Sequence, residues 1–404
     1  MSKKIFDDGT TLPEKFLLTK EFTKIFELIE NDNLNLFITG KAGTGKSTFL
    51  EYFRKKTKKN HAILAPTGIT AIKAKGKTIH SFFKFPPRFI VKDDVKLLKD
   101  RQLLQRMDTL LIDESSMIRS DIFDSIDYSL KINRGNKKPF GGVQIVLLGD
   151  LFQLPPVVSS SEKEVVEKFY PEGEYFFNSK CFPQGNFKIK ELTKIFRQSD
   201  KNFINLLNKF RLAEVNHEDL KIINRRRVSE NYEIPKGAIV LSPRNRKVDQ
   251  INNTKLEEIK SKSFSYEAVI HDSFKENEYP VKKTLNLKVG AQVMITKNDI
   301  SEEKKYVNGT LATIVKLSHD EIKIKVKDKI INLPKSKWEK IDYRLSGNNI
   351  NPKVIGKFIQ YPIKLAWAAT IHKCQGQTFD EVAIDLDEGA FTHGQTYVAL
   401  SRAK

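Results

Sequence analysis

The sequence predicts an α/β protein with two parallel-sheet domains, and three features of the chain predict it. Its 404 residues exceed the roughly 250–300 residues at which one hydrophobic core usually stops growing, so two or more domains are expected. Apolar strand patterns alternate with helical patterns up to about residue 190, which is typical of a parallel sheet with helices on both faces. The same alternation restarts at 239–256 and resumes from 358, on either side of a segment rich in short strand patterns.

The first strand pattern, 35–39, leads into a glycine-rich loop, GKAGTGKS at 40–47, and a helical pattern follows. The spacing GxxxxGK[ST] between strand and helix predicts a phosphate-binding loop, with an accidental glycine turn as the alternative. Glycines let backbone amides point at phosphate oxygens, Lys46 adds a positive charge, and the Ser47 hydroxyl suits Mg²⁺. The predicted nucleotide contacts here are Gly40, Ala42, Gly43, Thr44, Gly45, Lys46, Ser47 and Thr48.

Two later strands end in side chains that would complete such a site. The apolar strand 109–112 ends in Asp113 and Glu114, which we expect to hold Mg²⁺ and to activate the attacking water as general base, respectively. The strand 143–148 leads to Gln153, whose amide is expected to sense the γ-phosphate. Acids that cap a helix and an ordinary polar turn are the alternatives. Together with the loop, these residues predict ATP and Mg²⁺ as cofactors.

The charge balance favours a polyanionic partner. The chain has 70 Lys plus Arg against 50 Asp plus Glu, a net charge of +20, although solvated lysines alone could give this balance. Two cysteines cannot build a disulfide framework or a four-ligand zinc site. The sequence shows no export signal and no run of about 18 apolar residues, so we expect a cytoplasmic or other intracellular location, nucleoid-associated in a bacterium, and no membrane partner.

Further segments resemble the motifs of superfamily 1 helicases in the correct order. They are APTG at 65–68, KTIHSFF at 77–83, LTKIFRQ at 192–198, TIHKCQGQT at 370–378 and YVALSR at 397–402. Within that superfamily, FGGVQ at 140–144 followed by GDLFQLPP at 149–156 looks like the signature of the Pif1-like, 1B branch. The resemblance covers about residues 20–404.

This resemblance implies two RecA-like P-loop NTPase domains that move along single-stranded DNA from 5′ to 3′ and unwind duplex DNA in replication, repair or recombination. Quadruplex DNA is a further candidate substrate. Arg197, Gly376 and Arg402 would complete the ATP site, and the two arginines must come from a second domain because they lie more than 150 residues beyond the loop. The expected partners are single-stranded DNA and its junctions with duplex, bound by a monomer.

We expect DNA contacts from small polar groups that hold phosphates and from an aromatic ring that stacks on a base. The predicted residues are Thr67, Gly68, Thr78, His80, Phe82, Pro243, Asn245, Thr370, His372 and Lys373. Two alternatives stay open. Phe82 could fill core space, and His372 could be a structural histidine with its hydrogen bonds satisfied.

The predicted domains follow from the patterns and the resemblance. The first RecA-like domain spans 1–190 with a small wedge insertion at about 84–106, and the second spans 191–261 and 356–404. An SH3-like, β-rich insertion fills 262–355, where lysines alternate with apolar residues at 322–327. That lysine face either contacts nucleic acid or is simply solvated.

Two features depart from the family pattern. Family members carry a glutamine ahead of the phosphate-binding loop that reads adenine, but residues 14–30 contain none, and Thr23 lies near the expected place. Selectivity for adenine is therefore open. Lys404 follows directly after the last motif, where relatives continue with a turn and a further strand, which is the pattern of a truncated chain.

Two other functions compete with the leading hypothesis. A RecD-like or Dda-like helicase of the same superfamily is the nearest, and the Pif1-like segment at 140–156 argues against it. A nucleic-acid-binding scaffold that uses ATP only as a switch is the second. Glu114 and both arginines argue against a switch, because binding alone does not require them.

Overall fold

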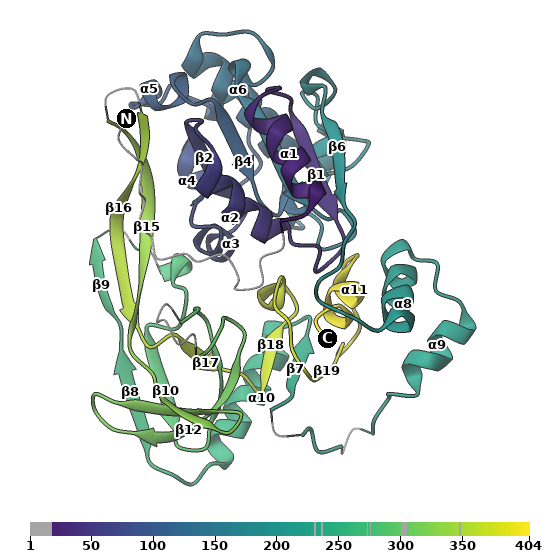
Figure 1. Cartoon of the computed structure of the whole chain (residues 1–404), viewed down its shortest axis with the longest axis vertical. Coiled ribbons are helices and arrows are strands. Elements are labelled where there is room, and N and C mark those ends of the chain that lie inside the picture. The colour runs from purple at the N-terminus through teal and green to yellow at the C-terminus, as the bar shows by residue number, and fades with distance from the viewer. Residues whose placement is uncertain are drawn as a thin grey trace.

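The computed structural model describes residues 18–404 except 230–231, 236, 273, 275, 300–304 and 347–348. The described chain forms two α/β bodies and a β-rich body (Figure 1). Residues 1–17, at which the first predicted domain begins, lie outside the described part of the chain. Within that described part, no helix is both long and apolar enough to cross a membrane.

The first domain is built on a six-stranded parallel sheet with the order β3-β2-β4-β5-β1-β6. The strands are β1 (Leu36–Gly40), β2 (His61–Ala65), β3 (Lys77–Thr78), β4 (Thr109–Ile112), β5 (Gln144–Gly149) and β6 (Lys188–Leu192). Because all six run in one direction, the loops that follow β1, β4 and β5 meet at the same edge of the sheet. This edge brings the glycine-rich loop, Asp113 and Gln153 together, as expected for open parallel sheets.

Two hydrophobic cores cover the two faces of this sheet. On one face, Phe22 and Ile29 of the first helix pack with Phe49 and Phe53 of the second. On the other face, Phe123 and Ile126 belong to a larger core. The helices are α1 (Lys20–Glu30), α2 (Lys46–Lys56), α3 (Gly68–Lys73), α4 (Ile79–Phe83), α5 (Arg101–Gln105), α6 (Ser120–Arg134) and α7 (Lys163–Phe169).

The predicted wedge at 84–106 is joined to the larger core of the first domain. Phe85, Ile90, Val95 and Leu104 are buried there. The exposed side of the segment is held by an ion pair between Arg88 and Asp94 at 2.6 Å. The segment is therefore anchored firmly to the first domain, as an element that separates DNA strands would need to be. Its role as a wedge stays a prediction.

The second domain has a parallel sheet of three strands in the order β18-β7-β19. The strands are β7 (Ile239–Ser242), β18 (Ala368–Thr370) and β19 (Val382–Ile384), with α10 (Asn245–Glu258) and α11 (Gln395–Leu400) beside them. The helices α8 (Lys201–Leu212) and α9 (His217–Asn224) connect the two domains, and α8 packs on α11 (Figure 1).

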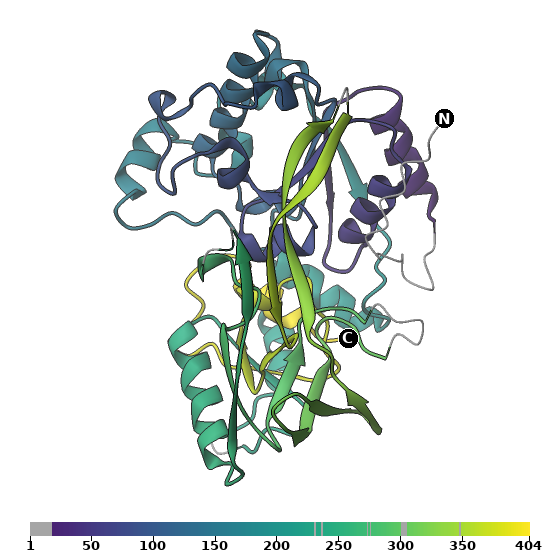
Figure 2. The same ribbon diagram turned by 90° about the vertical axis from the view of Figure 1, so that its left-hand side faces the viewer.

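The β-rich body contains a five-stranded antiparallel sheet, β14-β13-β12-β11-β17, and a long hairpin formed by β15 and β16. Its strands are β8 (Ser263–Glu267), β9 (Val269–Asp272), β10 (Thr284–Lys288), β11 (Gln292–Ile295), β12 (Leu311–Leu317), β13 (Ile322–Val326), β14 (Lys329–Asn332), β15 (Ser336–Ser346), β16 (Asn349–Gln360) and β17 (Ile363–Leu365). Figure 2 shows the hairpin running from this body up to the first domain.

Two predicted boundaries cut through strands. The boundary at 190 falls inside β6, which pairs with β1, so the first sheet continues to Leu192. The boundary at 355 falls inside β16, and β17 pairs with β11, so the insertion reaches about residue 365. Phe358, predicted to resume the parallel sheet, pairs with Trp338 in the hairpin instead. An apolar pattern indicates that a strand forms but does not identify its partner, which explains these differences.

Candidate functional site

The glycine-rich loop wraps around the amino end of α2. Gly43 and Gly45 have φ values of +84° and +90°, which glycine adopts without strain. A Cβ atom on Gly43 would also lie only 2.6 Å from Cβ of Arg197. The backbone amides of the first helical turn have no helical acceptors and border a pocket of about 350 Å³. The loop therefore has the backbone geometry of an anion site.

Lys46 and the two predicted acids lie together at this pocket. The Lys46 ammonium donates to the carbonyl oxygen of Lys41 at 3.2 Å, and burial lowers its pKa despite the neighbouring carboxylates of Asp150, Glu114 and Asp113. Burial raises the pKa of Asp113 and of Glu114. For Glu114, the charge of Asp113 raises the pKa further. The charges of Lys73 and Lys46 oppose the rise for both acids, and a bound metal ion would act in the same direction.

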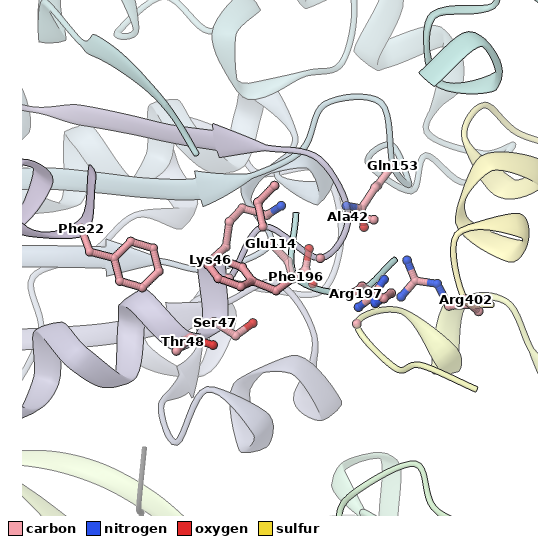
Figure 3. Close-up of a pocket in the computed structure, with 14 residues that line it drawn as sticks. Phe22, Ala42, Lys46, Ser47, Thr48, Glu114, Gln153, Phe196, Arg197 and Arg402 are labelled. Atoms are coloured by element: carbon pink, nitrogen blue, oxygen red, sulfur yellow. The ribbon is translucent and has the colours of Figure 1, made fainter. Parts of the chain in front are cut away.

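Residues beyond the first sheet also line this pocket (Figure 3). Gly376 and Arg402 come from the second domain, whereas Arg197, predicted to come from that domain, lies in the link between β6 and α8. Arg402 is only 1% exposed, and its Nε donates to the Val398 carbonyl oxygen at 2.8 Å. Burial, followed by the nearby charge of Arg197, lowers the pKa of Arg402 to about 9. Arg197 donates to the Ser401 carbonyl oxygen at 3.2 Å. The two guanidinium groups thus share one region, and Gly376 also lines it.

All predicted nucleotide contacts except Gly40 line this pocket, together with Glu114 and Gln153. Gly40 ends β1 at the base of the loop, where a Cβ atom would lie 2.7 Å from the Leu192 carbonyl oxygen. Asp113 lies behind the pocket wall at 8% exposure, with its Oδ1 accepting the Glu114 amide at 3.0 Å.

Sequence reasoning missed residues that join the two domains at this site. The Gln375 amide donates to Oε2 of Glu114 at 3.1 Å and to Oε1 of Gln153 at 3.2 Å. The Tyr397 hydroxyl accepts the backbone amide of Ala42 at 3.1 Å. Both residues lie inside motif segments quoted from the sequence, so their importance was visible, but their contacts depend on how the domains meet.

Lys73 is a further cation that the sequence did not reveal. It ends α3, and a Cβ atom on Gly376 would lie only 2.2 Å from its ammonium nitrogen. The surrounding protein displaces water and lowers the pKa of Lys73, although Glu114 and Asp113 oppose this effect. Lys73 therefore extends from the first domain to the second-domain edge of the pocket.

The predicted DNA residues of the first domain have mixed outcomes. The side-chain oxygens of Thr67 and Thr78 cap α3 and α4 by accepting the amides of Thr70 and Ser81, respectively. His80 is half-buried, and burial lowers its pKa. The expectation that Phe82 stacks on a base is wrong for this structure. Its ring is 6% exposed and packs edge-on against Phe83, with ring centroids 4.9 Å apart, inside the larger core.

The second-domain residues gather after β7 and β18. Asn245 begins α10 and is exposed, whereas Pro243 is buried. The Thr370 hydroxyl is buried and accepts the Lys373 amide at 3.4 Å. The His372 ring stacks on Phe391, with ring centroids 6.3 Å apart, and burial lowers its pKa. Lys373 is exposed, so Asn245 and Lys373 are the most accessible members of this group.

The β15–β16 hairpin reaches the predicted DNA residues of the first domain. A small hollow between them is lined by Gly68 and Thr78 on one side and by Phe274 and Lys340 on the other. Lys340 pairs with Glu278 at 2.6 Å, and both side chains are mostly buried. The hairpin therefore covers part of the surface that was predicted to bind DNA.

Comparison with protein families agrees with this architecture. A family model described as PIF1-like helicase matches residues 17–221, and a second, described as the 2B domain of DNA helicase Pif1, matches residues 272–317. The first match covers half of the chain and includes the glycine-rich loop, both acids and Gln153. The chain belongs to the PIF1-like helicase family.

Relatives of this family match along nearly the whole chain. The ATP-dependent DNA helicase Pif1 of Bdellovibrio bacteriovorus is 31% identical over 398 residues, covering 96% of this chain and 86% of that protein. The ATP-dependent DNA helicase PIF1 of Xenopus laevis is 30% identical over 98% of this chain. The chain spans 61% of the length of the Xenopus relative and 60% of the Danio rerio relative.

Solved structures of Bacteroides Pif1 distinguish two arrangements of the family. The unliganded protein is 41% identical, and the match covers 96% of this chain and 90% of that one, with a TM-score of 0.88. The protein bound to single-stranded DNA has the same identity and coverage but a TM-score of 0.68. The present structure is therefore more similar to the unliganded structure of that protein than to its complex with single-stranded DNA.

Proposed function

We propose that this chain is an ATP-dependent DNA helicase that moves along single-stranded DNA from 5′ to 3′ and unwinds duplex DNA. One observation carries the proposal. The phosphate-binding loop of the first domain, Arg197 in the link and the buried Arg402 of the second domain line one pocket, so a nucleotide would contact both domains at once. The helicase names of the relatives, and the Bacteroides Pif1 complexes with ADP-AlF4 and with single-stranded DNA, support it.

The residues are suited to phosphoryl transfer, which requires charge neutralisation and an aligned water more than covalent chemistry. Lys46 and the loop amides would bind the β- and γ-phosphates. Arg197 and Arg402 would neutralise charge that develops on the transferred phosphoryl group. Glu114, held by the Gln375 amide at 3.1 Å, would accept a proton from the attacking water.

The donor set fits Mg²⁺ delivered with the nucleotide. Asp113 and Ser47 offer hard oxygen ligands, which Mg²⁺ prefers, and Asp113 lies close enough to Lys46 for the lysine charge to affect its pKa. No group of three or more His, Cys, Asp or Glu side chains in the described residues could hold a metal ion. The ion would therefore depend on phosphate oxygens, and it would supply positive charge between them.

Coupling to movement follows from the position of the pocket. Gln375 contacts Glu114 and Gln153, so loss of the γ-phosphate would be transmitted to the segment 370–378 that carries Thr370, His372 and Lys373. If nucleotide favours a closed cleft and its loss an open one, DNA-gripping groups of the two domains alternate their hold on the strand. The proposed active form is a monomer on single-stranded DNA or at a junction.

An unwinding assay tests the proposal and its direction together. Duplexes with a 5′ or a 3′ single-stranded tail are mixed with protein, ATP and Mg²⁺, and strand separation is followed. We expect separation of the 5′-tailed duplex only. Lys46→Ala, which removes the charge that binds the phosphates, is the control and should abolish separation. Unwinding of only the 3′-tailed duplex would reject the direction, and ATP hydrolysis without any unwinding would favour a switched scaffold.

A further inference from the structure

The nucleotide pocket has two chemically different ends. Lys46, Glu114, Gln153 and the arginines gather at the end where the γ-phosphate of a bound nucleotide would lie. The pocket also extends past Thr48, which follows the phosphate-binding serine on α2. There its wall includes the phenyl rings of Phe22 and Phe196, and Figure 3 shows Phe22 on the opposite side of the loop from Arg402. The base of a nucleotide would face this aromatic end.

Both rings are held at fixed positions beside the loop. The Phe22 side chain is 2% exposed and packs edge-on against Phe49, with ring centroids 5.4 Å apart. A Cβ atom on Gly45 would lie 3.2 Å from Cζ of Phe22 and 3.8 Å from Cε2 of Phe196. The Phe196 amide donates to the Gly43 carbonyl oxygen at 2.9 Å, which anchors its ring to the loop.

Phe196 also keeps much of its ring accessible. The residue is 48% exposed, and the Lys194 ammonium lies 5.3 Å from the ring centroid. An anchored and accessible ring is a suitable stacking surface, and every nucleic-acid base offers a π-face to it.

Side chains that could read the edge of a base are used elsewhere in the described part of the pocket. The Thr23 hydroxyl, next to Phe22 on α1, donates to the Thr19 carbonyl oxygen at 3.4 Å. Gln153 is the side-chain amide among the described lining residues, and it lies at the γ-phosphate end, where its Oε1 accepts from Gln375. Apart from the Thr48 hydroxyl, the described side chains at the base end are therefore apolar.

We propose that this site selects nucleotides by their triphosphate and by aromatic stacking, and not by base identity, so that purine and pyrimidine nucleoside triphosphates all serve as fuel. The proposal rests on the proposed function. Sites that hydrogen-bond a substrate group reject analogues by roughly 10⁴–10⁵-fold, whereas apolar pockets discriminate by only about 10–200-fold. A pocket end lined by aromatic rings is apolar, so we expect the smaller discrimination here.

Steady-state hydrolysis of ATP, GTP, CTP and UTP, each with Mg²⁺ and saturating single-stranded DNA, tests this inference. We expect all four to be hydrolysed, with kcat/KM values spread over no more than about 200-fold. A preference for ATP beyond that spread would overturn the inference and leave the proposed function standing. Hydrolysis of none of the four would reject the proposed function itself.

Variants of Phe196 test the stacking separately. Phe196→Ala should raise KM for all four nucleotides by a similar factor, about 5–150-fold, with little change in kcat, whereas Phe196→Tyr should restore KM. Phe169→Ala is the matched control, because Phe169 is also 48% exposed but lies outside the pocket. An Ala variant of Phe196 with unchanged KM, or with KM raised for ATP alone, would contradict a base-independent stack.

Discussion

At the scale of single residues, the site gathers buried charged groups of both signs. The pKa of Lys46 and of Arg402 is lowered, and the pKa of Asp113 and of Glu114 is raised, mainly because each group is buried. Binding of a metal ion and a polyphosphate would compensate both sets of groups. Because the pKa of both acids is raised in the folded, nucleotide-free protein, the folded state binds protons more tightly than the unfolded state. The stability that this adds is present at low pH and is lost as the pH rises through the folded-state pKa of the acids.

Glu114→Gln separates binding from chemistry. The substitution keeps the size of the side chain but removes the general base, so the DNA-stimulated rate of ATP hydrolysis should fall about 10²–10⁴-fold while nucleotide affinity changes little. A pre-steady-state hydrolysis assay combined with equilibrium binding of a fluorescent ATP analogue measures both. A variant that hydrolyses ATP at the original rate would remove Glu114 from the proposed chemistry.

At the scale of elements, the sequence predicted those helices, strands and loops that local residue patterns define. The strand-loop-helix around Lys46 and the strand before Asp113 were predicted because spacing and periodicity define them. The burial of Phe82 was an open alternative, since a helix pattern does not show which face meets the core. The contacts of Gln375 and the pairing of β16 with β9 also escaped prediction, because both depend on partners far away along the chain.

The β15–β16 hairpin should move away from the first domain when DNA binds. It now contacts α3, β3 and α5, and it covers Thr78. Fluorescent labels at the exposed positions Arg101 on α5 and Lys353 on β16 should lose energy transfer on addition of single-stranded DNA. Labels at Arg101 and Lys138, both in the first domain, provide the control and should show no change. Unchanged transfer in the first pair would show that DNA binds without displacing the hairpin.

At the scale of the whole molecule, the net charge of +20 favours the proposed DNA binding. Binding of a single strand should release counterions, so the logarithm of the association constant should fall linearly with the logarithm of salt concentration, by about 0.7 per neutralised phosphate. Fluorescence anisotropy with a labelled oligonucleotide measures this slope. A slope near zero would contradict phosphate-based gripping.

The central claim is that arginines from beyond the first sheet complete the nucleotide site. The direct measurement is single-turnover ATP hydrolysis by Arg197→Ala and Arg402→Ala at saturating DNA, with nucleotide affinity determined in parallel. Each variant should hydrolyse ATP about 10³–10⁵-fold more slowly while it still binds nucleotide, because such arginines act on charge that develops in the transition state. Hydrolysis within tenfold of the unmodified protein in both variants would contradict the claim.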